Sequence, residues 1–202
     1  MQVDLSTLTP AQNYALMTQT IIPRPIAWLI SENADSSLNL APFSYFNALS
    51  SSPPMIMVSI GLQATGEKKD TRINIEERKH FVVNIAHKEM AGPLTASSAT
   101  MAPGVSEVDE LKLTTAPIEG FAVPRLADCR LAYACKLDAV HMINDQAIVF
   151  AKLITLYIDD AVADTDAKGR LKINANAVDA LGRLGGGEYV TAGETIVIER
   201  PE

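Results

Sequence analysis

Residues 39–71, NLAPFSYFNALSSSPPMIMVSIGLQATGEKKDT, constrain the fold more than any other stretch of the chain. A polar and aromatic run at residues 44–52 leads through two prolines into an apolar segment at residues 55–60. A loop with glycine and lysines then meets a helix start at Asp70. The apolar segment alternates poorly, which is typical of a strand buried on both faces. We therefore expect it inside a barrel or at the seam between two subunits.

Local signals predict the other elements of the N-terminal half. Thr9 and Pro10 supply an N-cap and a first helical residue, so a short helix is expected at residues 10–17. Asp70 is predicted to cap a second helix at residues 71–78. Strands are expected at residues 26–31, from residue 38 onward and at residues 80–86, with the polar residues 31–37 as a hairpin loop.

The C-terminal half contains a second strand-rich region. Residues 127–142 and 146–157 flank Asn144 and Asp145, which predicts a long β-hairpin. Residues 91–119 show no period and contain Gly-Pro and Pro-Gly pairs, so we expect short helices and loops there. The tail is expected to have a polar turn at residues 164–170, a short helix at residues 176–181 and then a glycine triplet at residues 185–187. This triplet lacks the spacing of a dinucleotide fingerprint, which argues against a Rossmann domain.

The composition limits which fold classes and which partners are compatible with this chain. A chain of 202 residues, 48% hydrophobic and 20% charged, suits one β-rich domain that spans residues 1–202. Its positive mean hydropathy indicates apolar surface buried against a second copy, so a homodimer is expected. The net charge of −7 argues against a nucleic-acid partner. The first residues show no targeting pattern and the apolar runs are too short to cross a membrane, which predicts a cytoplasmic protein.

The cysteines and histidines predict neither a disulfide nor a metal site. Cys129 and Cys135 are expected on the same face of one strand, roughly 20 Å apart along it, which is too far for a disulfide. Two free thiols are therefore predicted. The histidines show no ligand spacing with one another or with the cysteines; they are His80, His87 and His141.

The loop before the second helix, GEKKDT, has two interpretations. Its glycine, Lys68 and Lys69 lie beside a helix N-terminus, and such a site can hold an anion such as a phosphate. Thr71 can add a hydroxyl donor to that site. The alternative is a solvated loop that Asp70 caps, which the residues alone favour because such caps are common.

Five runs in sequence order resemble the flavin reductase-like family of FMN-binding split barrels, which includes flavoredoxin. These runs are RPIAWLIS at residues 24–31, NLAPFSYFNALSSSPP at 39–54, KDT at 69–71, FVVNI at 81–85 and GRLGGGEY at 182–189. The resemblance implies a mainly β fold, a Greek-key antiparallel barrel of the split type with peripheral helices. It also implies a homodimer with one FMN per subunit near the interface.

The same resemblance implies which residues contact the cofactor. It favours the phosphate interpretation of the GEKKDT loop, and it places the flavin ring and ribityl chain along residues 44–47 and Ser59. The expected cofactor-binding residues are Ser44, Tyr45, Phe46, Asn47, Ser59, Lys69, Asp70, Thr71, Arg183, Tyr189 and Arg24. From the residues alone, Phe46 also suits an ordinary core aromatic and Arg183 the last turn of a helix that ends at Gly185. Arg24 suits either a phosphate contact or a solvated edge.

The activity that the resemblance implies is that of an NAD(P)H:flavin oxidoreductase, with NADH or NADPH as a transient donor. Electrons would pass to free flavin, a partner oxygenase or another acceptor, and no general acid or base is assigned. One departure bears on this activity, because many family members carry Gly-Asp-His at the second barrel hairpin and this chain carries Asn144, Asp145 and Gln146. Two alternatives therefore stay open: a flavoredoxin-like electron carrier without efficient NAD(P)H oxidation, and a binding protein without flavin.

Overall fold

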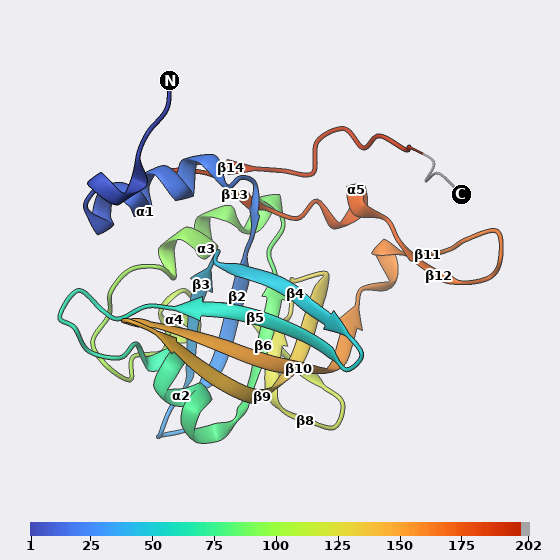
Figure 1. Ribbon diagram of the computed structural model, residues 1–202. Helices are drawn as coiled ribbons and strands as arrows, with labels where there is room; N and C mark the ends of the chain where they lie inside the picture. Colours follow the sequence, from blue (N-terminus) through green and yellow to red (C-terminus); the bar gives the residue numbers. More distant parts are fainter. Residues whose placement is uncertain (199–202) are drawn as a thin grey trace.

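Seven antiparallel strands form the main sheet of the computed structural model, which describes residues 1–198 of the chain. In spatial order they are β3 (Leu38–Phe43), β2 (Ala27–Glu32), β6 (His80–Ile85), β9 (Leu131–Ile143), β10 (Gln146–Ile158), β5 (Pro54–Ile60) and β4 (Phe46–Ser51). The sheet curls into a barrel, and the strands at its two ends, β3 and β4, follow each other in the chain (Figure 1). Tyr45 lies at the corner where β3 leads into β4, and its carbonyl accepts a hydrogen bond from the N–H of Ser59 at 2.8 Å. The prediction of a mainly β fold with an antiparallel barrel is confirmed.

Alternation along the strands supplies two separate cores, because successive side chains point to opposite faces of a sheet. Phe81 belongs to the core inside the barrel, which Ile75 of helix α2 (Asp70–Arg78) closes at one end. Trp28 belongs to the core outside, and its indole N–H donates to Ser97 Oγ at 2.8 Å. The cover over this outer core consists of α3 (Ala91–Ala96), β7 (Thr115–Ile118) and β8 (Phe121–Leu126).

Strand β5 is buried on one face only. Ile56, Val58 and Ile60 are buried, whereas the residues between them are half-buried. The prediction that the barrel interior buries both faces of this strand is therefore wrong, whereas burial at a seam between two subunits stays a prediction. The physical reason is that only one face of β5 points into the barrel.

Helix α1 begins as its local sequence predicts, whereas the N-terminus of helix α2 differs from the prediction. Helix α1 (Pro10–Thr20) starts with a capping box, in which Thr9 and Gln12 exchange hydrogen bonds. Helix α2 has Lys69, not Asp70, at its N-cap position, and no side chain caps it. The Asp70 carboxylate instead accepts a hydrogen bond from the N–H of Gly104 at 3.1 Å. The predicted Asp70 cap is therefore wrong, because the carboxylate is hydrogen-bonded to Gly104 in a distant loop.

The long hairpin of β9 and β10 is confirmed, with Asn144 in the left-handed conformation at its turn.

Both cysteines are free, as predicted, and both are buried. The expectation that they share a strand face is wrong, because Cys129 precedes β9 and joins the outer core, whereas Cys135 joins the inner one. Burial raises the pKa of both thiols, to about 12 for Cys129.

Residues 91–119 contain the short helices α3 and α4 (Glu107–Glu110), as predicted, and also strand β7. Strand β8, the partner of β7, was not predicted from the sequence. The remaining short elements are η1 (Leu5–Thr7), η2 (Lys88–Met90), η3 (Asp160–Val162), β11 (Ala163–Thr165) and β12 (Leu171–Ile173).

A small sheet at the top of the barrel in Figure 1 joins the two ends of the chain. It consists of β1 (Arg24–Pro25), β13 (Gly182–Arg183) and β14 (Tyr189–Val190). Helix α5 (Ala175–Val178) ends at Asp179, which has a φ of 47° in the left-handed region. The interpretation of Arg183 as part of a helix that stops at Gly185 is therefore wrong, since Arg183 lies in a strand.

Two kinds of feature are absent from residues 1–198. No helix in that part of the chain combines the length and the apolar character needed to cross a membrane. No group of three or more His, Cys, Asp or Glu residues is suitably placed there to hold a metal ion.

Candidate functional site

Two adjoining hollows meet beside Phe43 and together form one groove. The first hollow is lined by Asn39, Ala41, Pro42, Phe43, Leu62, Gln63, Ala64, Lys69, Asp70, Thr71, Ser97, Ser98, Ala99, Thr100, Met101 and Glu107. The second is lined by Tyr14, Ile26, Pro42, Phe43, Ser44, Tyr45, Ser59, Gly61, Lys69, Leu94, Ser98, Gln146, Arg183 and Tyr189. Pro42, Phe43, Lys69 and Ser98 line both, so these residues mark the junction.

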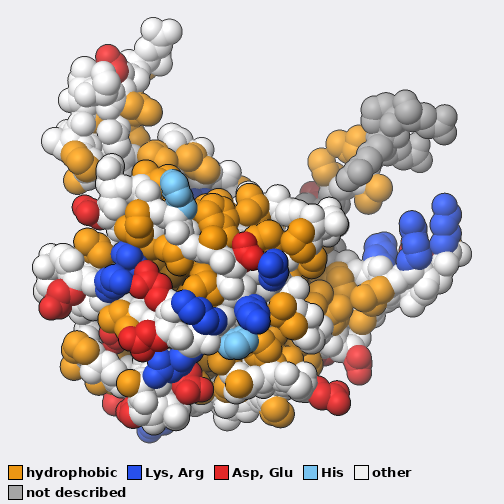
Figure 2. Space-filling view, turned by 60° about the horizontal axis from the view of Figure 1, so that its bottom comes forward, with side chains coloured by type: hydrophobic (Ala, Val, Ile, Leu, Met, Phe, Trp, Pro, Cys, Tyr) orange, Lys and Arg blue, Asp and Glu red, His pale blue; other side chains and the backbone are white. Residues whose placement is uncertain are grey.

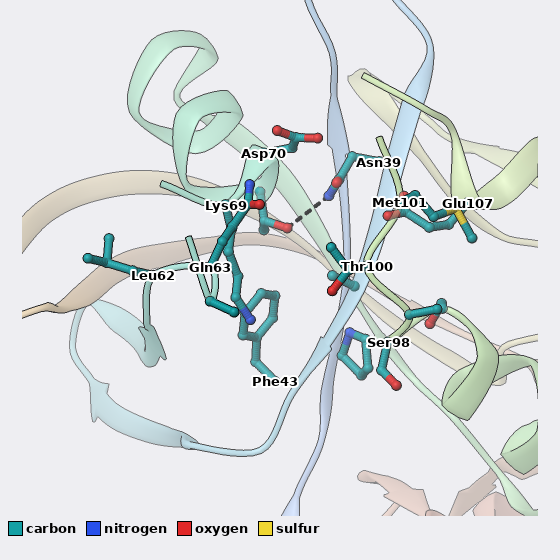
Figure 3. Close-up of a pocket in the computed structure, with 16 residues that line it drawn as sticks. Asn39, Phe43, Leu62, Gln63, Lys69, Asp70, Ser98, Thr100, Met101 and Glu107 are labelled. Carbon is teal, nitrogen blue, oxygen red and sulfur yellow. Dashed lines mark hydrogen bonds between the residues drawn. The ribbon is translucent and has the colours of Figure 1, made fainter. Parts of the chain in front are cut away.

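The first hollow is built at the N-terminus of α2. The N–H groups in the first turn of a helix have no partner within it, and the helix dipole favours negative charge at that end. Lys69 directly precedes this turn, and its Nζ lies 5.5 Å from the centre of the Phe43 ring. Figure 3 shows Lys69 and Gln63 on one side of the hollow, with Ser98 and Thr100 on the other. Backbone N–H groups, a cation and hydroxyls thus surround a space in which an anion fits.

Lys69 and its neighbour Lys68 have different surroundings. The Lys68 Nζ lies 2.6 Å from the Glu76 carboxylate, which engages its charge on the outer side of α2. Lys69 forms no ion pair with any carboxylate of residues 1–198, and burial lowers the pKa of its ammonium group. Lys69 is half-buried, and a partly buried cation without a counter-ion carries a desolvation cost that an anionic ligand would offset.

A buried polar network holds the floor of the first hollow. Thr71 is 1% exposed, and its hydroxyl accepts a hydrogen bond from the Asn39 side chain at 2.8 Å, drawn as a dashed line in Figure 3. The same Asn39 amide donates to Ser31 Oγ at 3.2 Å. Thr71 still has its own proton to donate, so it can serve a ligand without leaving the network.

Two carboxylates, Glu107 and Asp70, also line the first hollow. Glu107 accepts a hydrogen bond from the N–H of Leu40 at 2.8 Å, and Asp70 accepts one from Gly104. Burial raises the pKa of Glu107, and the negative charge of Asp70 raises it further. Both carboxylates are thus occupied by backbone N–H groups, which reduces their repulsion of an anion in the hollow.

The second hollow is lined largely by aromatic and small polar side chains. The Tyr14 ring on α1 and the Tyr45 ring at the corner between β3 and β4 have centres 6.2 Å apart. Burial raises the pKa of Tyr45. Ser59 Oγ donates to the Gln146 side chain at 3.2 Å. A flat ring with polar edges would find both an aromatic wall and hydrogen-bonding groups here.

Arg183 and Tyr189 form the outer wall of the second hollow as a stacked pair. The Arg183 guanidinium lies 4.6 Å from the centre of the Tyr189 ring. It also donates to the carbonyl of Glu188 at 2.9 Å and to that of Gly186. The Tyr189 hydroxyl is 3.0 Å from Thr95 Oγ1, so this side chain is held from the α3 side as well.

Most of the residues that the sequence predicted for cofactor binding line this groove. They are Ser44, Tyr45, Ser59, Lys69, Asp70, Thr71, Arg183 and Tyr189. Phe46, Asn47 and Arg24 do not line it. Phe46 packs against the inner core, and the exposed Asn47 side chain accepts a hydrogen bond from the N–H of Ala48.

Arg24 is a buried structural residue rather than a groove-lining one. It is 6% exposed and donates to the carbonyls of Thr18 at 2.5 Å, Ile21 at 2.9 Å and Leu184 at 3.0 Å. It also donates to Ser44 Oγ at 3.2 Å. Arg24 therefore connects the end of α1, the strand that carries Arg183 and the corner that carries Tyr45. Neither interpretation drawn from the sequence, a phosphate contact or a solvated edge, describes these contacts.

Tyr14 and residues 97–101 are among the parts of the groove that sequence reasoning missed. Tyr14 lies on α1, which was predicted without a role in the site, and residues 97–101 follow α3 in a segment that was interpreted as variable surface. The serines and the threonine of this segment were the available signal. Nothing local indicated that they would face Lys69, because their position depends on how α3 packs on the barrel.

Comparison with known proteins gives consistent results. The model of the flavin reductase like domain matches residues 17–173. An uncharacterized protein of Halalkalibacterium halodurans is 34% identical over 100% of this chain and 97% of its own length. The structure of nitrilotriacetate monooxygenase component B from Bacillus cereus matches with a TM-score of 0.88 and 30% identity, covering 98% of each chain. The 2-nitrobenzoate 2-nitroreductase of Pseudomonas fluorescens matches with a TM-score of 0.89 and 29% identity, over 100% of this chain and 96% of that one.

Proposed function

Because the chain belongs to the flavin reductase-like family, with its split-barrel fold, we propose that it binds FMN in the groove and acts as an NAD(P)H-dependent flavin reductase. The observation that carries this proposal is the continuity of the two hollows. An anion-binding helix N-terminus opens into a space lined by aromatic rings, in the order that the phosphate and the ring of FMN require.

The residues present fit FMN at both ends of the groove. Lys69, the N–H groups of Asp70 and Thr71 in the first turn of α2, and the Thr71 hydroxyl would hold the phosphate. Ser44, Tyr45 and Ser59 would orient the ring. The redox chemistry, hydride uptake from NADH or NADPH and electron delivery to an acceptor, is that of the bound flavin, and the protein supplies position and hydrogen bonds.

The pyridine nucleotide would have to reach the flavin from the open second hollow. Gln146, at the position where the sequence departs from the family pattern, lines this hollow and is bonded to Ser59. It offers an amide but no group that titrates near neutral pH. We infer that NADH or NADPH docks there transiently, and that the acceptor is free flavin, an oxygenase or another protein.

Anaerobic reduction of the flavin tests the proposal. The protein loaded with FMN is expected to lose its visible absorbance when NADH or NADPH is added, with a Michaelis constant in the upper part of the usual ~1 μM to 1 mM range. The control is an equal concentration of free FMN without protein. Failure of both nucleotides, combined with fast bleaching by a reduced protein donor, would favour the electron-carrier alternative instead. A protein that cannot be loaded with FMN would support the flavin-free alternative.

We also propose a homodimer, on the basis of apolar side chains that the barrel leaves exposed. They are Leu49 on β4, Met142 and Ile143 on β9, and Ile154 and Leu156 on β10. On the face shown in Figure 2, hydrophobic side chains gather between charged ones. Obligate interfaces commonly bury more than ~2,000 Å² and are rich in such side chains.

Sedimentation at micromolar concentration is expected to give twice the chain mass of 21.7 kDa. Ile154→Glu should shift the protein toward the monomer, because a carboxylate buried in an apolar interface is unfavourable. Leu171→Glu is the matched control, since Leu171 is 65% exposed on β12, outside the barrel. A wild-type protein that sediments only as a monomer would exclude the dimer.

A further inference from the structure

We propose that helix α1 is a docking element for a second copy of this chain, and that its docking couples assembly to flavin binding. An exposed apolar face of the helix would pack against the partner subunit. Tyr14, on the same face, would thereby be fixed as a wall of the second hollow. The coupling rests on the proposed function, because it assumes that a flavin occupies the groove.

Helix α1 is well formed but is hardly buried by its own chain. It has 11 residues and a capping box at its start, yet Thr18 is the only one of them that residues 1–198 bury. An isolated helix of this length is marginal in water, so most helices are stabilised by packing one face on a core. In Figure 1, α1 lies above the barrel and outside the main sheet. The described chain therefore supplies little of the packing that this helix needs.

The apolar residues of α1 form a stripe that faces outward. Tyr14, Met17 and the C-cap residue Ile21 are spaced by three and four positions, which places them on one face of a helix. They are 63%, 38% and 56% exposed. In the surface helix of a globular protein such a stripe normally faces the core. Its exposure here indicates a surface that another molecule covers.

The contacts at the end of α1 hold this stripe in a fixed direction. The Arg24 guanidinium donates to the carbonyls of Thr18 and Ile21. Gly185, in the loop between β13 and β14, allows the helix to lie directly on that loop, because a side chain at this position would overlap Gln19. A helix that is already oriented loses little conformational freedom when a partner covers its open face.

The absence of charge on this segment favours a second copy of the chain as the partner. Residues 5–23 contain no Asp, Glu, Lys, Arg or His, although charged residues make up 20% of the chain. A partner recognised by electrostatic attraction would find no charged group there. Two copies, each with a net charge of −7, would repel each other least across an uncharged surface. The cores of protein interfaces are depleted of charged residues in the same way.

The stripe would be one part of a larger interface. A standard interface takes ~800 Å² from each partner, which is more than three partly exposed side chains supply. The exposed apolar residues on β9 and β10 offer further area of the same chemistry. The proposed homodimer therefore requires α1 in addition to the barrel.

Docking of α1 would affect the flavin through Tyr14. This side chain lines the second hollow, with its ring centre 6.2 Å from that of Tyr45. A partner that covers Met17 and Ile21 also holds the helix that carries Tyr14. Dimerisation and binding of the flavin ring would then be linked, so that each favours the other.

Sedimentation of Met17→Glu tests the docking. A carboxylate in a covered apolar face is unfavourable, so the dissociation constant of the dimer is expected to rise about tenfold or more. Gln12→Glu is the matched control. It adds the same charge to the same helix on a different face, and glutamate can replace glutamine in the capping box with Thr9. A wild-type protein that is only monomeric, or a Met17→Glu protein that dimerises like the wild type, would overturn the proposal.

Amide hydrogen exchange gives a second readout that needs no change in α1. The amides of α1 are expected to be protected in the dimer and to exchange faster after dilution to the monomer. Those of β6, at the centre of the main sheet, should stay protected in both states. The monomeric Ile154→Glu protein should lose protection in α1 in the same way, although its substitution lies on β10. Equal protection of α1 in monomer and dimer would contradict the docking.

Flavin titration tests the coupling and separates its failure from that of the proposed function. Met17→Glu, at concentrations where it is monomeric, is expected to weaken FMN and riboflavin equally, by about threefold, because the loss concerns the ring and not the phosphate. Unchanged affinity for both flavins would overturn the coupling. A wild-type protein that takes up no FMN would refute the proposed function, and sedimentation and hydrogen exchange would still test the docking of α1.

Discussion

Replacing Lys69 by methionine is expected to weaken FMN binding by about tenfold or more and to leave riboflavin binding nearly unchanged. Only FMN carries the phosphate that the Lys69 ammonium and the N-terminus of α2 favour, and a hydrogen bond to a charged group contributes roughly 1.5–3 kcal/mol. Methionine keeps the unbranched, apolar part of the side chain beside Phe43. Equilibrium titration with both flavins, followed by protein fluorescence, measures the two affinities.

Lys68→Met is the matched control for this experiment. Lys68 is the adjacent lysine, but its charge is engaged by Glu76 on the outer side of α2. Its replacement should change FMN affinity far less than that of Lys69. Thr71 is a poorer target, because it is buried and its hydroxyl also accepts from Asn39. Equal losses for FMN and riboflavin in Lys69→Met would place the phosphate elsewhere in the groove.

The same site should depend on alkaline pH. Burial lowers the pKa of Lys69 below the ordinary lysine value of 10.5, so its charge is lost at a lower pH than that of an exposed lysine. The preference for FMN over riboflavin should therefore decline as the pH rises toward that range. In Lys69→Met this decline should be absent.

Replacing Arg24 by methionine should lower the free energy of unfolding by about 3 kcal/mol or more. The substitution leaves the carbonyls of Thr18, Ile21 and Leu184 without their donor. For a chain of this size the melting temperature should fall by roughly 6–12 °C. Urea and thermal unfolding, followed by circular dichroism, measure both quantities.

Arg170→Met is the control for Arg24, because Arg170 lies in an exposed turn and its ion pair with Asp166 should contribute little. Its effect should stay within about 0.5 kcal/mol. If Arg24→Met instead keeps wild-type stability and loses only FMN, then Arg24 contacts the cofactor, as the sequence-based interpretation had it. The contacts of Arg24 predict instead that Arg24→Met lowers the stability of the protein, and that any loss of FMN binding follows from this destabilisation.

The sequence by itself was sufficient for the elements whose signals are local. Thr9 and Pro10 start α1 with a capping box because the interacting groups lie within one helical turn. Asn144 marks the turn of the β9–β10 hairpin because few residues tolerate its left-handed conformation. The resemblance to split-barrel flavoproteins likewise rested on contiguous runs, and these contain 12 of the 26 residues that line the groove.

The tertiary structure decided the roles of residues whose partners are distant in the chain. Asp70 has the local signature of a cap, yet Gly104 takes its carboxylate. From the sequence, Arg24 resembles a surface or phosphate-binding arginine. In the structure its guanidinium instead donates to the carbonyl of Leu184, which is 160 residues away in the chain. Tyr14 enters the site only because α1 is held against the corner of the barrel. Local rules act over a few residues, whereas these contacts form only once the barrel closes and brings the two ends of the chain together.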